Sequence, residues 1–112
     1  MAIDAIYPSL KDKTVLITGG GSGIGEALTR AFIAQSAKVG FMDYDKAASE
    51  TLAAELDSPD LHFEYCDLRD IDALQVAVKA VSAKLGPIRI LVNNAARDDR
   101  HSLESAVSYT HL

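Results

Sequence analysis

Apolar residues recur along this chain in two alternating patterns. Four short runs rich in apolar and β-branched residues are typical of strands, and they span residues 14–18, 38–42, 61–66 and 88–92. Between them lie three stretches with helical spacing, which run from Gly23 to about Gln35, from Asp45 to about Leu56, and from Asp70 to Gly86. The last stretch is the most regular, and its spacing predicts a buried face made of Ile71, Leu74, Val78, Val81 and Leu85.

This alternation of strands and helices predicts the fold. A strand that is followed by a helix and another strand forms a right-handed crossover between parallel neighbours. We therefore expect an α/β protein with a doubly wound parallel sheet of about four strands and three helices. In the third strand Leu61, Phe63 and Tyr65 should share one face, and His62 and Glu64 the other, which is typical of an edge strand with one wetter face.

Composition and charge mainly exclude classes of function. A chain of 112 residues forms at most one small domain. The net charge of −5 and the lack of a Lys/Arg cluster argue against a nucleic-acid surface, and no apolar run reaches the roughly 20 residues of a membrane span. The N-terminus lacks a secretory signal pattern, and the single cysteine, Cys66, should pack as a small apolar residue. We expect a cytoplasmic protein with no nucleic-acid or membrane partner.

A glycine-rich loop, Thr18-Gly19-Gly20-Gly21-Ser22-Gly23-Ile24-Gly25, joins the first predicted strand to the first predicted helix. Bare N–H groups at the N-terminus of a helix favour an anion, typically a phosphate. The P-loop pattern is absent, and the G-x-G-x-x-G fingerprint fails at every glycine of the loop. The loop instead fits T-G-x-x-x-G-x-G, with Gly19, Gly23 and Gly25 in the fixed places. The alternative is a flexible turn whose glycines act as C-caps.

With this spacing the chain resembles the short-chain dehydrogenase/reductase family, and three further motifs agree. Asp43 ends the second strand 18 residues after Gly25, Asp67-Leu68 follows the third strand, and Asn93-Asn94-Ala95-Ala96 is similar to the family's N-N-A-G. Over residues 1–105 the resemblance implies an incomplete, Rossmann-like NAD(P)-binding domain with strand order 3-2-1-4. The cofactor-binding residues that it implies are Gly19, Ser22, Gly23, Ile24, Gly25, Asp43, Asp67, Leu68, Asn93, Asn94 and Ala95.

The cofactor that this pattern favours is NAD. A carboxylate at Asp43 can accept hydrogen bonds from the ribose hydroxyls and repels the 2′-phosphate of NADP, and no cation stands at Ser22 or Tyr44 to offset that repulsion. Asp43 could instead cap the second helix, although Asp45 can do so as well. For Asp67 the resemblance implies contact with the adenine, and a turn at the strand end is a compatible alternative. The two asparagines are either a polar turn or also a wall of the nicotinamide ribose pocket.

The catalytic residues that the resemblance implies are a Tyr four residues before a Lys, with a Ser and an Asn, all after the N-N-A-G element. Only 16 residues follow Ala96. Tyr109 comes too soon after the fourth strand to be the catalytic tyrosine, and the Lys expected four residues later would fall at position 113, past the given sequence. We therefore predict no catalytic residue here. Asp98, Asp99 and His101 have no metal-ligand spacing, so we predict no metal site. With residues 5–11 and the glycine loop, the 98–101 segment resembles NAD-dependent aldose 1-dehydrogenases of the D-xylose type, which oxidise a sugar hemiacetal to its lactone.

Residues 106–112 depart from the family, which suggests a truncated frame or a foreign tail. We then expect the NAD-binding half of a short-chain oxidoreductase that is inactive alone and, with its apolar fourth strand at an open edge, aggregates or folds marginally. The full-length form should be a homo-oligomer acting on a small alcohol or aldose. One alternative is a free-standing nucleotide-binding or regulatory module. Another is an S-adenosylmethionine-dependent methyltransferase, which would not be expected to carry Asp67 and the asparagine pair.

Overall fold

The computed structural model of the chain describes residues 7–94, which form a four-stranded parallel sheet with three α-helices and one short 3-10 helix. In chain order the elements are η1 (Pro8–Leu10), β1 (Thr14–Thr18), α1 (Gly23–Ala34), β2 (Lys38–Asp43), α2 (Lys46–Leu56), β3 (Leu61–Tyr65), α3 (Ile71–Leu85) and β4 (Ile88–Asn93). The strand order is β3-β2-β1-β4, and every neighbouring pair is parallel. The predicted doubly wound sheet and its order are confirmed.

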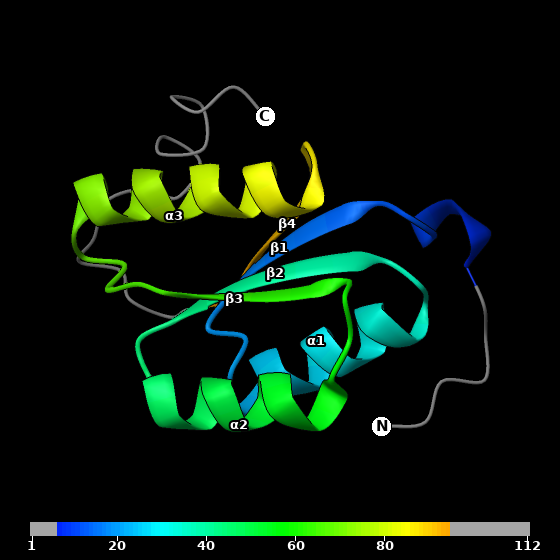
Figure 1. The fold of residues 1–112 in the computed structure, drawn as a ribbon, viewed down its shortest axis with the longest axis horizontal. Coiled ribbons are helices and arrows are strands. Elements are labelled where there is room, and N and C mark those ends of the chain that lie inside the picture. Colours follow the sequence, from blue (N-terminus) through cyan, green and yellow to red (C-terminus); the bar gives the residue numbers. More distant parts are fainter. Residues whose placement is uncertain (1–6, 95–112) are drawn as a thin grey trace.

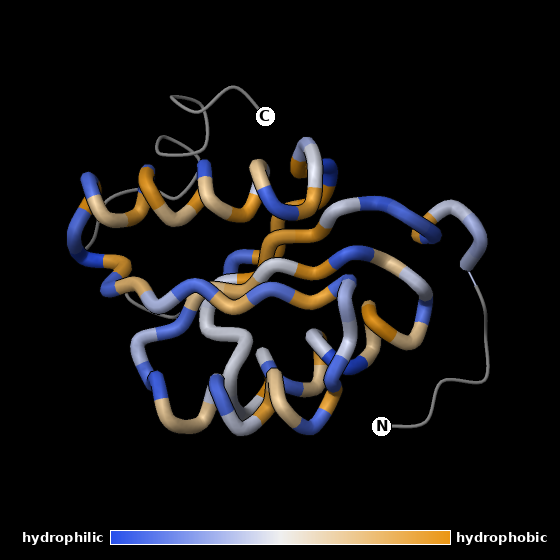
Figure 2. The backbone as a smooth tube through the Cα atoms, viewed as in Figure 1, coloured by the Kyte–Doolittle hydropathy of each residue, from blue (hydrophilic) through white to orange (hydrophobic). Residues whose placement is uncertain are grey.

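The helices cover the two faces of the sheet unequally. Helices α1 and α2 lie on one face, and α3 lies on the other (Figure 1). Along α3, hydrophilic and hydrophobic positions alternate, as expected for a helix with one face against the sheet (Figure 2). The buried residues of α3 include all those predicted except Ile71, which is partly buried against the same core.

β1 is the centre of the core because side chains from both faces of it are buried. Val15 and Ile17 pack toward α1 and α2, while Leu16 packs among the residues of α3. The whole strand is buried, which explains why its sequence is a continuous apolar run bounded by threonines rather than an alternation. β1 ends at Thr18, and the glycine loop begins directly after it.

β3 is an edge strand, as predicted, but its exposed residue is not on the expected face. Phe63 stacks on Phe41 of β2 at a centroid distance of 5.1 Å, whereas Tyr65 is 53% exposed. Tyr65 lies in register with Asp43 at the end of the sheet, and its ring stacks on Tyr44 instead of entering the core. The prediction that one face of β3 packs on the core is therefore confirmed for Leu61 and Phe63. It is wrong for Tyr65, whose side chain is exposed.

Three helix ends follow the sequence closely. The Asp45 carboxylate accepts a hydrogen bond from the Ala48 N–H at the start of α2, and Asp70 accepts one from the Ala73 N–H at the start of α3. Gly86, with φ of 96°, ends α3.

None of the helices within residues 7–94 is long and apolar enough to cross a membrane. Several predictions concern residues outside the described part: Ala95, Asp98, Asp99, His101, Tyr109 and the 106–112 tail.

Candidate cofactor site

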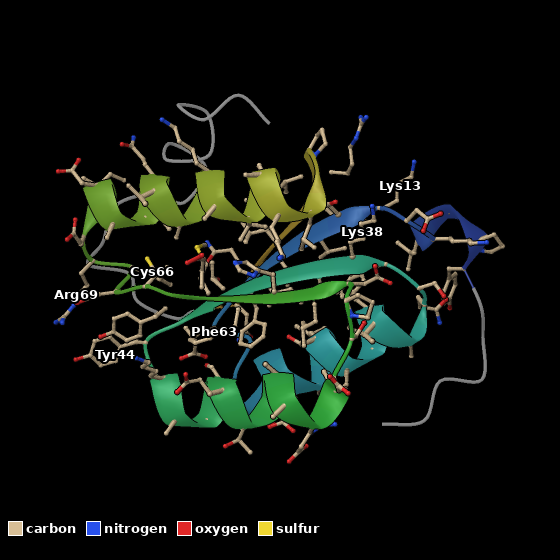
Figure 3. The ribbon with its side chains drawn as sticks, in the orientation of Figure 1. Lys13, Lys38, Tyr44, Phe63, Cys66 and Arg69 are labelled. Atoms are coloured by element: carbon tan, nitrogen blue, oxygen red, sulfur yellow. The ribbon has the colours of Figure 1, made fainter. Side chains whose placement is uncertain are left out.

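The predicted cofactor residues meet at the carboxyl edge of the sheet. Thr18 of β1 lies in register with Met42 on one side and Asn93 on the other, so the ends of three strands lie side by side. Tyr44, Cys66 and Arg69 lie at this edge, on the left of the view, and Lys13 and Lys38 mark the opposite end (Figure 3). Ligands of open α/β sheets bind beyond the carboxyl ends of the strands, so this edge is the candidate site.

Two glycines of the loop are required by its geometry. Gly19 has φ of 69°, and its N–H donates to the carbonyl of Met42 at 2.7 Å as the chain leaves β1. A Cβ on Gly25 would lie only 1.7 Å from the Gly19 carbonyl oxygen, so α1 rests directly on the backbone of the loop. Gly23, at φ of 59°, has nothing within 4 Å of an added Cβ. An added side chain would therefore have room at Gly23 but not at Gly25.

α1 begins at this open point. Its N-cap residue, Ser22, makes no side-chain capping bond, and Ile24 in the first turn is 73% exposed. The first N–H groups of a helix have no partner within the helix, and they carry the positive end of the helix dipole. The start of α1 is thus accessible and suited to an anion.

The two asparagines at the end of β4 hold the loop from the other side. The side-chain amide of Asn94 donates to the Gly19 carbonyl at 3.1 Å, and its backbone N–H donates to Oγ1 of Thr18 at 2.9 Å. The Thr18 hydroxyl in turn donates to Oδ1 of Asn93 at 3.1 Å. The polar-turn interpretation of these asparagines is therefore confirmed. Their contact with a nicotinamide ribose stays a prediction.

Thr29, which was not predicted as a site residue, supports the loop from inside. Thr29 is wholly buried, and its hydroxyl lies 3.1 Å from the Gly20 carbonyl and 2.9 Å from the Gly25 carbonyl, within hydrogen-bond distance of both. A Cβ on Gly20 would lie 2.5 Å from Cβ of Phe41, so this glycine packs on β2. The signal in the sequence was a threonine among the inward-facing residues of α1, four positions after Gly25.

Asp43 is held by two backbone amides. Its Oδ2 accepts a hydrogen bond from the Gly21 N–H at 2.8 Å, and its Oδ1 accepts one from the Asp45 N–H at 2.8 Å. The N-cap of α2 is Asp45, so the alternative in which Asp43 is that cap is wrong. Because each carboxylate oxygen has two lone pairs, both oxygens of Asp43 can still accept another donor.

Asp67 and Leu68 follow β3 in a turn. The Asp67 carboxylate accepts from the backbone N–H of Arg69 and from its guanidinium, with Nη2 at 2.9 Å, and this raises the pKa of Arg69. The strand-end turn is therefore present, and the adenine contact of Asp67 stays a prediction. Leu68 packs, partly buried, against the core on the α3 side. The pairing by Arg69 was not foreseen from the sequence.

Cys66 packs as a small apolar residue, as predicted. It is 2% exposed and lies in the core beside α3. Burial, followed by the nearby carboxylates of Asp67, Asp70 and Glu64, raises the pKa of its thiol to about 11. A thiol in this state is a poor nucleophile at neutral pH, so we assign it no nucleophilic role.

A groove of about 310 Å³ lies between α1 and α2 and reaches the glycine loop at Gly21 and Ser22. Its basic residue, Arg30, is paired with two carboxylates, Glu26 of the same helix and Glu55 of α2. Both arginines placed so far, Arg30 and Arg69, are thus neutralised by acidic partners. Within residues 7–94, no group of three or more His, Cys, Asp or Glu side chains could hold a metal ion.

Comparison with known proteins agrees with this geometry. The model of the short chain dehydrogenase family matches residues 13–109. The chain is 48% identical over 103 residues to a probable galactose dehydrogenase of Rhizobium meliloti, covering 88% of this chain and 40% of that protein. It is 50% identical over 101 residues to a D-xylose 1-dehydrogenase of Caulobacter vibrioides, covering 88% of this chain and 39% of that one. The chain thus spans about two fifths of the length of these curated relatives.

A solved structure extends the likeness to three dimensions. The 3-ketoacyl-(acyl-carrier-protein) reductase from Brucella melitensis, complexed with NADH, is similar to this chain with a TM-score of 0.69 and 36% identity. The match covers 73% of this chain and 34% of the reductase.

Proposed function

The chain belongs to the short-chain dehydrogenase family, and on that premise we propose that residues at its carboxyl edge bind NAD for the oxidation of an alcohol or sugar hemiacetal. The observation that supports NAD most strongly is the fixed carboxylate of Asp43. Two backbone amides orient it, and both oxygens keep acceptor capacity for the two hydroxyls of the adenosine ribose.

The same carboxylate disfavours NADP. A 2′-phosphate would bring two negative charges close to Asp43, and only a nearby cation could offset the repulsion. Arg30 is already paired with Glu26 and Glu55, and Arg69 with Asp67. Neither arginine offers an unpaired charge to a phosphate, which supports NAD over NADP.

The other residues of the site receive complementary roles. The open N-terminus of α1 and the backbone of the loop around Gly23 bind the pyrophosphate, which needs N–H donors and close approach. Asp67 and Leu68 contact the adenine, while Asn93 and Asn94 hold the loop and border the nicotinamide ribose. Bound NAD supplies the acceptor for a hydride. We assign no proton-transfer role to residues 7–94, so we expect dehydrogenase activity to require residues beyond them.

For the substrate we propose an aldose. The two curated relatives described above are named as galactose and D-xylose dehydrogenases, and each is about half identical to this chain. In this reaction the hydrogen on C1 of the cyclic sugar leaves as a hydride to NAD, and the C1 hydroxyl loses its proton to a base, which yields the lactone and NADH. The homo-oligomer and the cytoplasmic location stay predictions.

The test compares the two cofactors directly. We expect the full-length protein to bind NADH more tightly than NADPH, and Asp43→Ala to lose that preference. Asp72→Ala removes an exposed carboxylate from the first turn of α3, on the opposite face of the sheet, and serves as the control. Tighter binding of NADPH by the wild type would contradict the assignment. Steady-state assays with D-xylose and D-galactose then test the substrate class.

A further inference from the structure

Gly21 occupies a position that leaves no room for a side chain, and its backbone conformation does not explain this. Gly19, Gly23 and Gly86 have positive φ, and Gly21 does not. A Cβ on Gly21 would nevertheless lie 2.2 Å from Oγ of Ser49 and 3.0 Å from Oδ2 of Asp43. The position needs glycine because two side chains lie against it, one from α2 and one from the end of β2.

Ser49 is the other half of this contact. It is wholly buried in α2, and among residues 7–94 its Oγ is the one buried side-chain polar atom with no hydrogen-bond partner. A buried hydroxyl without a hydrogen-bond partner lowers the stability of the fold, so a serine at this position needs a structural reason. The explanation we find is size: serine is small enough to let the loop reach Asp43 at this point.

The close approach of Gly21 to Ser49 lies beside a hydrogen bond to Asp43. The Gly21 N–H donates to Oδ2 of Asp43 at 2.8 Å, and the Asp45 N–H, one turn before Ser49, fixes Oδ1. If the loop moved away from Ser49, the carboxylate would keep only one of its two backbone donors. It could then rotate about its side-chain bonds and present a less defined pair of acceptors to a ribose.

We propose that Gly21 and Ser49 are positioning residues that set the preference for NAD over NADP, because their close contact holds the Asp43 carboxylate in place. This inference rests on the proposed function and deepens it. It assigns selectivity to two residues that present no charge to the cofactor. A purely structural role would weaken the binding of both dinucleotides equally, so the ratio of the two dissociation constants is the informative quantity.

The experiment measures the dissociation constants of NADH and NADPH by fluorescence in the full-length protein. We expect Gly21→Ala to reduce the preference for NADH about tenfold, the usual worth of a hydrogen bond to a charged group. The double variant Gly21→Ala/Ser49→Ala should recover part of the preference, because removing Oγ relieves the 2.2 Å contact. The matched control is Thr51→Ala, which removes a hydroxyl from the exposed side of α2 and should keep the wild-type ratio.

A second measurement needs no cofactor. Relative to the wild type, the Gly21 amide resonance should shift in Asp43→Ala and in Ser49→Thr, where the added methyl group enlarges the residue beside Gly21. It should not shift in Thr51→Ala. Unchanged selectivity in Gly21→Ala, in a protein that prefers NADH, would overturn the positioning role alone. If Gly21→Ala does not fold, an unchanged selectivity and resonance in Ser49→Thr overturns it. A wild type that binds neither dinucleotide would overturn the proposed function and, with it, this inference.

Discussion

The side-chain amide of Asn94 donates a hydrogen bond to the carbonyl of Gly19 at 3.1 Å, across 75 residues of sequence. A Cβ on Gly25 would lie 2.8 Å from the same Asn94 nitrogen and 1.7 Å from the same Gly19 oxygen. The end of β4, the start of the glycine loop and the first turn of α1 therefore meet at one point. The shape of the loop depends on a residue that lies far from it in the sequence.

The first prediction concerns Asn94. Asn94→Ala leaves the Gly19 carbonyl without this donor, and we expect a loss of about 1 kcal/mol in the free energy of unfolding. Asn94→Asp should lose more, since a carboxylate has no N–H to donate and faces a carbonyl oxygen. Urea denaturation of the full-length protein measures both. Equal losses in the two variants would show that the Asn94 side chain does not donate to the Gly19 carbonyl in solution.

The second prediction separates two reasons for glycine in the loop. Gly25→Ala places a methyl group against the backbone of Gly19, which has no side chain that could move aside, and we expect a loss of at least about 3 kcal/mol. Gly23→Ala is the matched control, because it meets nothing within 4 Å and is opposed only by its positive φ. Its expected cost is about 1–2 kcal/mol.

Both values come from the unfolding midpoint and slope in urea, measured on the two variants beside the wild type. If Gly23→Ala proved the more damaging variant, backbone conformation rather than close packing would dominate the loop.

The sequence could predict those features that depend on short-range pattern. The order of elements, the caps at Asp45 and Asp70, and the places of Gly19 and Gly25 follow from hydrophobic period and turn chemistry. The boundaries of the four strands and three α-helices came within about one residue of their expected places, because Gly, Pro and capping residues mark the ends, whereas the short 3-10 helix at Pro8–Leu10 was not predicted.

Features that depend on long-range packing could not be predicted. Nothing in the spacing of Gly21 and Asp43 shows that the amide of one reaches the carboxylate of the other across 22 residues. The exposure of Tyr65 likewise depends on where the helical layers stop, and an alternating strand pattern does not contain that information. The charge of Arg69 was visible in the sequence, but its pairing with Asp67 needed the geometry of the turn.

The third prediction is a pH dependence of stability from Cys66. Burial raises the pKa of its thiol from about 9 to about 11. Between these values the unfolded chain has lost the thiol proton while the folded chain keeps it, so stability falls as pH rises through this window. The loss approaches about 2 kcal/mol, since one pKa unit corresponds to about 1.4 kcal/mol.

The measurement is the free energy of unfolding at pH 8 and at pH 11 in the wild type and in Cys66→Ala. All other ionisable groups are common to both proteins, so their contributions cancel in the comparison. The wild type should lose about 2 kcal/mol more than the variant over this interval. Parallel profiles would show that the thiol titrates alike in the folded and unfolded chains.

The last prediction concerns Arg69. Its backbone N–H and its guanidinium occupy both oxygens of Asp67, so an adenine amino group that approaches this carboxylate must displace part of the pairing. Exposed ion pairs are weak, and the competition is therefore modest. We expect Arg69→Leu, which keeps an apolar side chain, to bind NADH and AMP about two- to fivefold more tightly and to leave nicotinamide mononucleotide unaffected. Arg89→Leu, an exposed arginine near the start of β4, controls for the change in net charge. Weaker binding of AMP by Arg69→Leu, with Arg89→Leu unchanged, would mean that Arg69 contacts the nucleotide rather than competing with it.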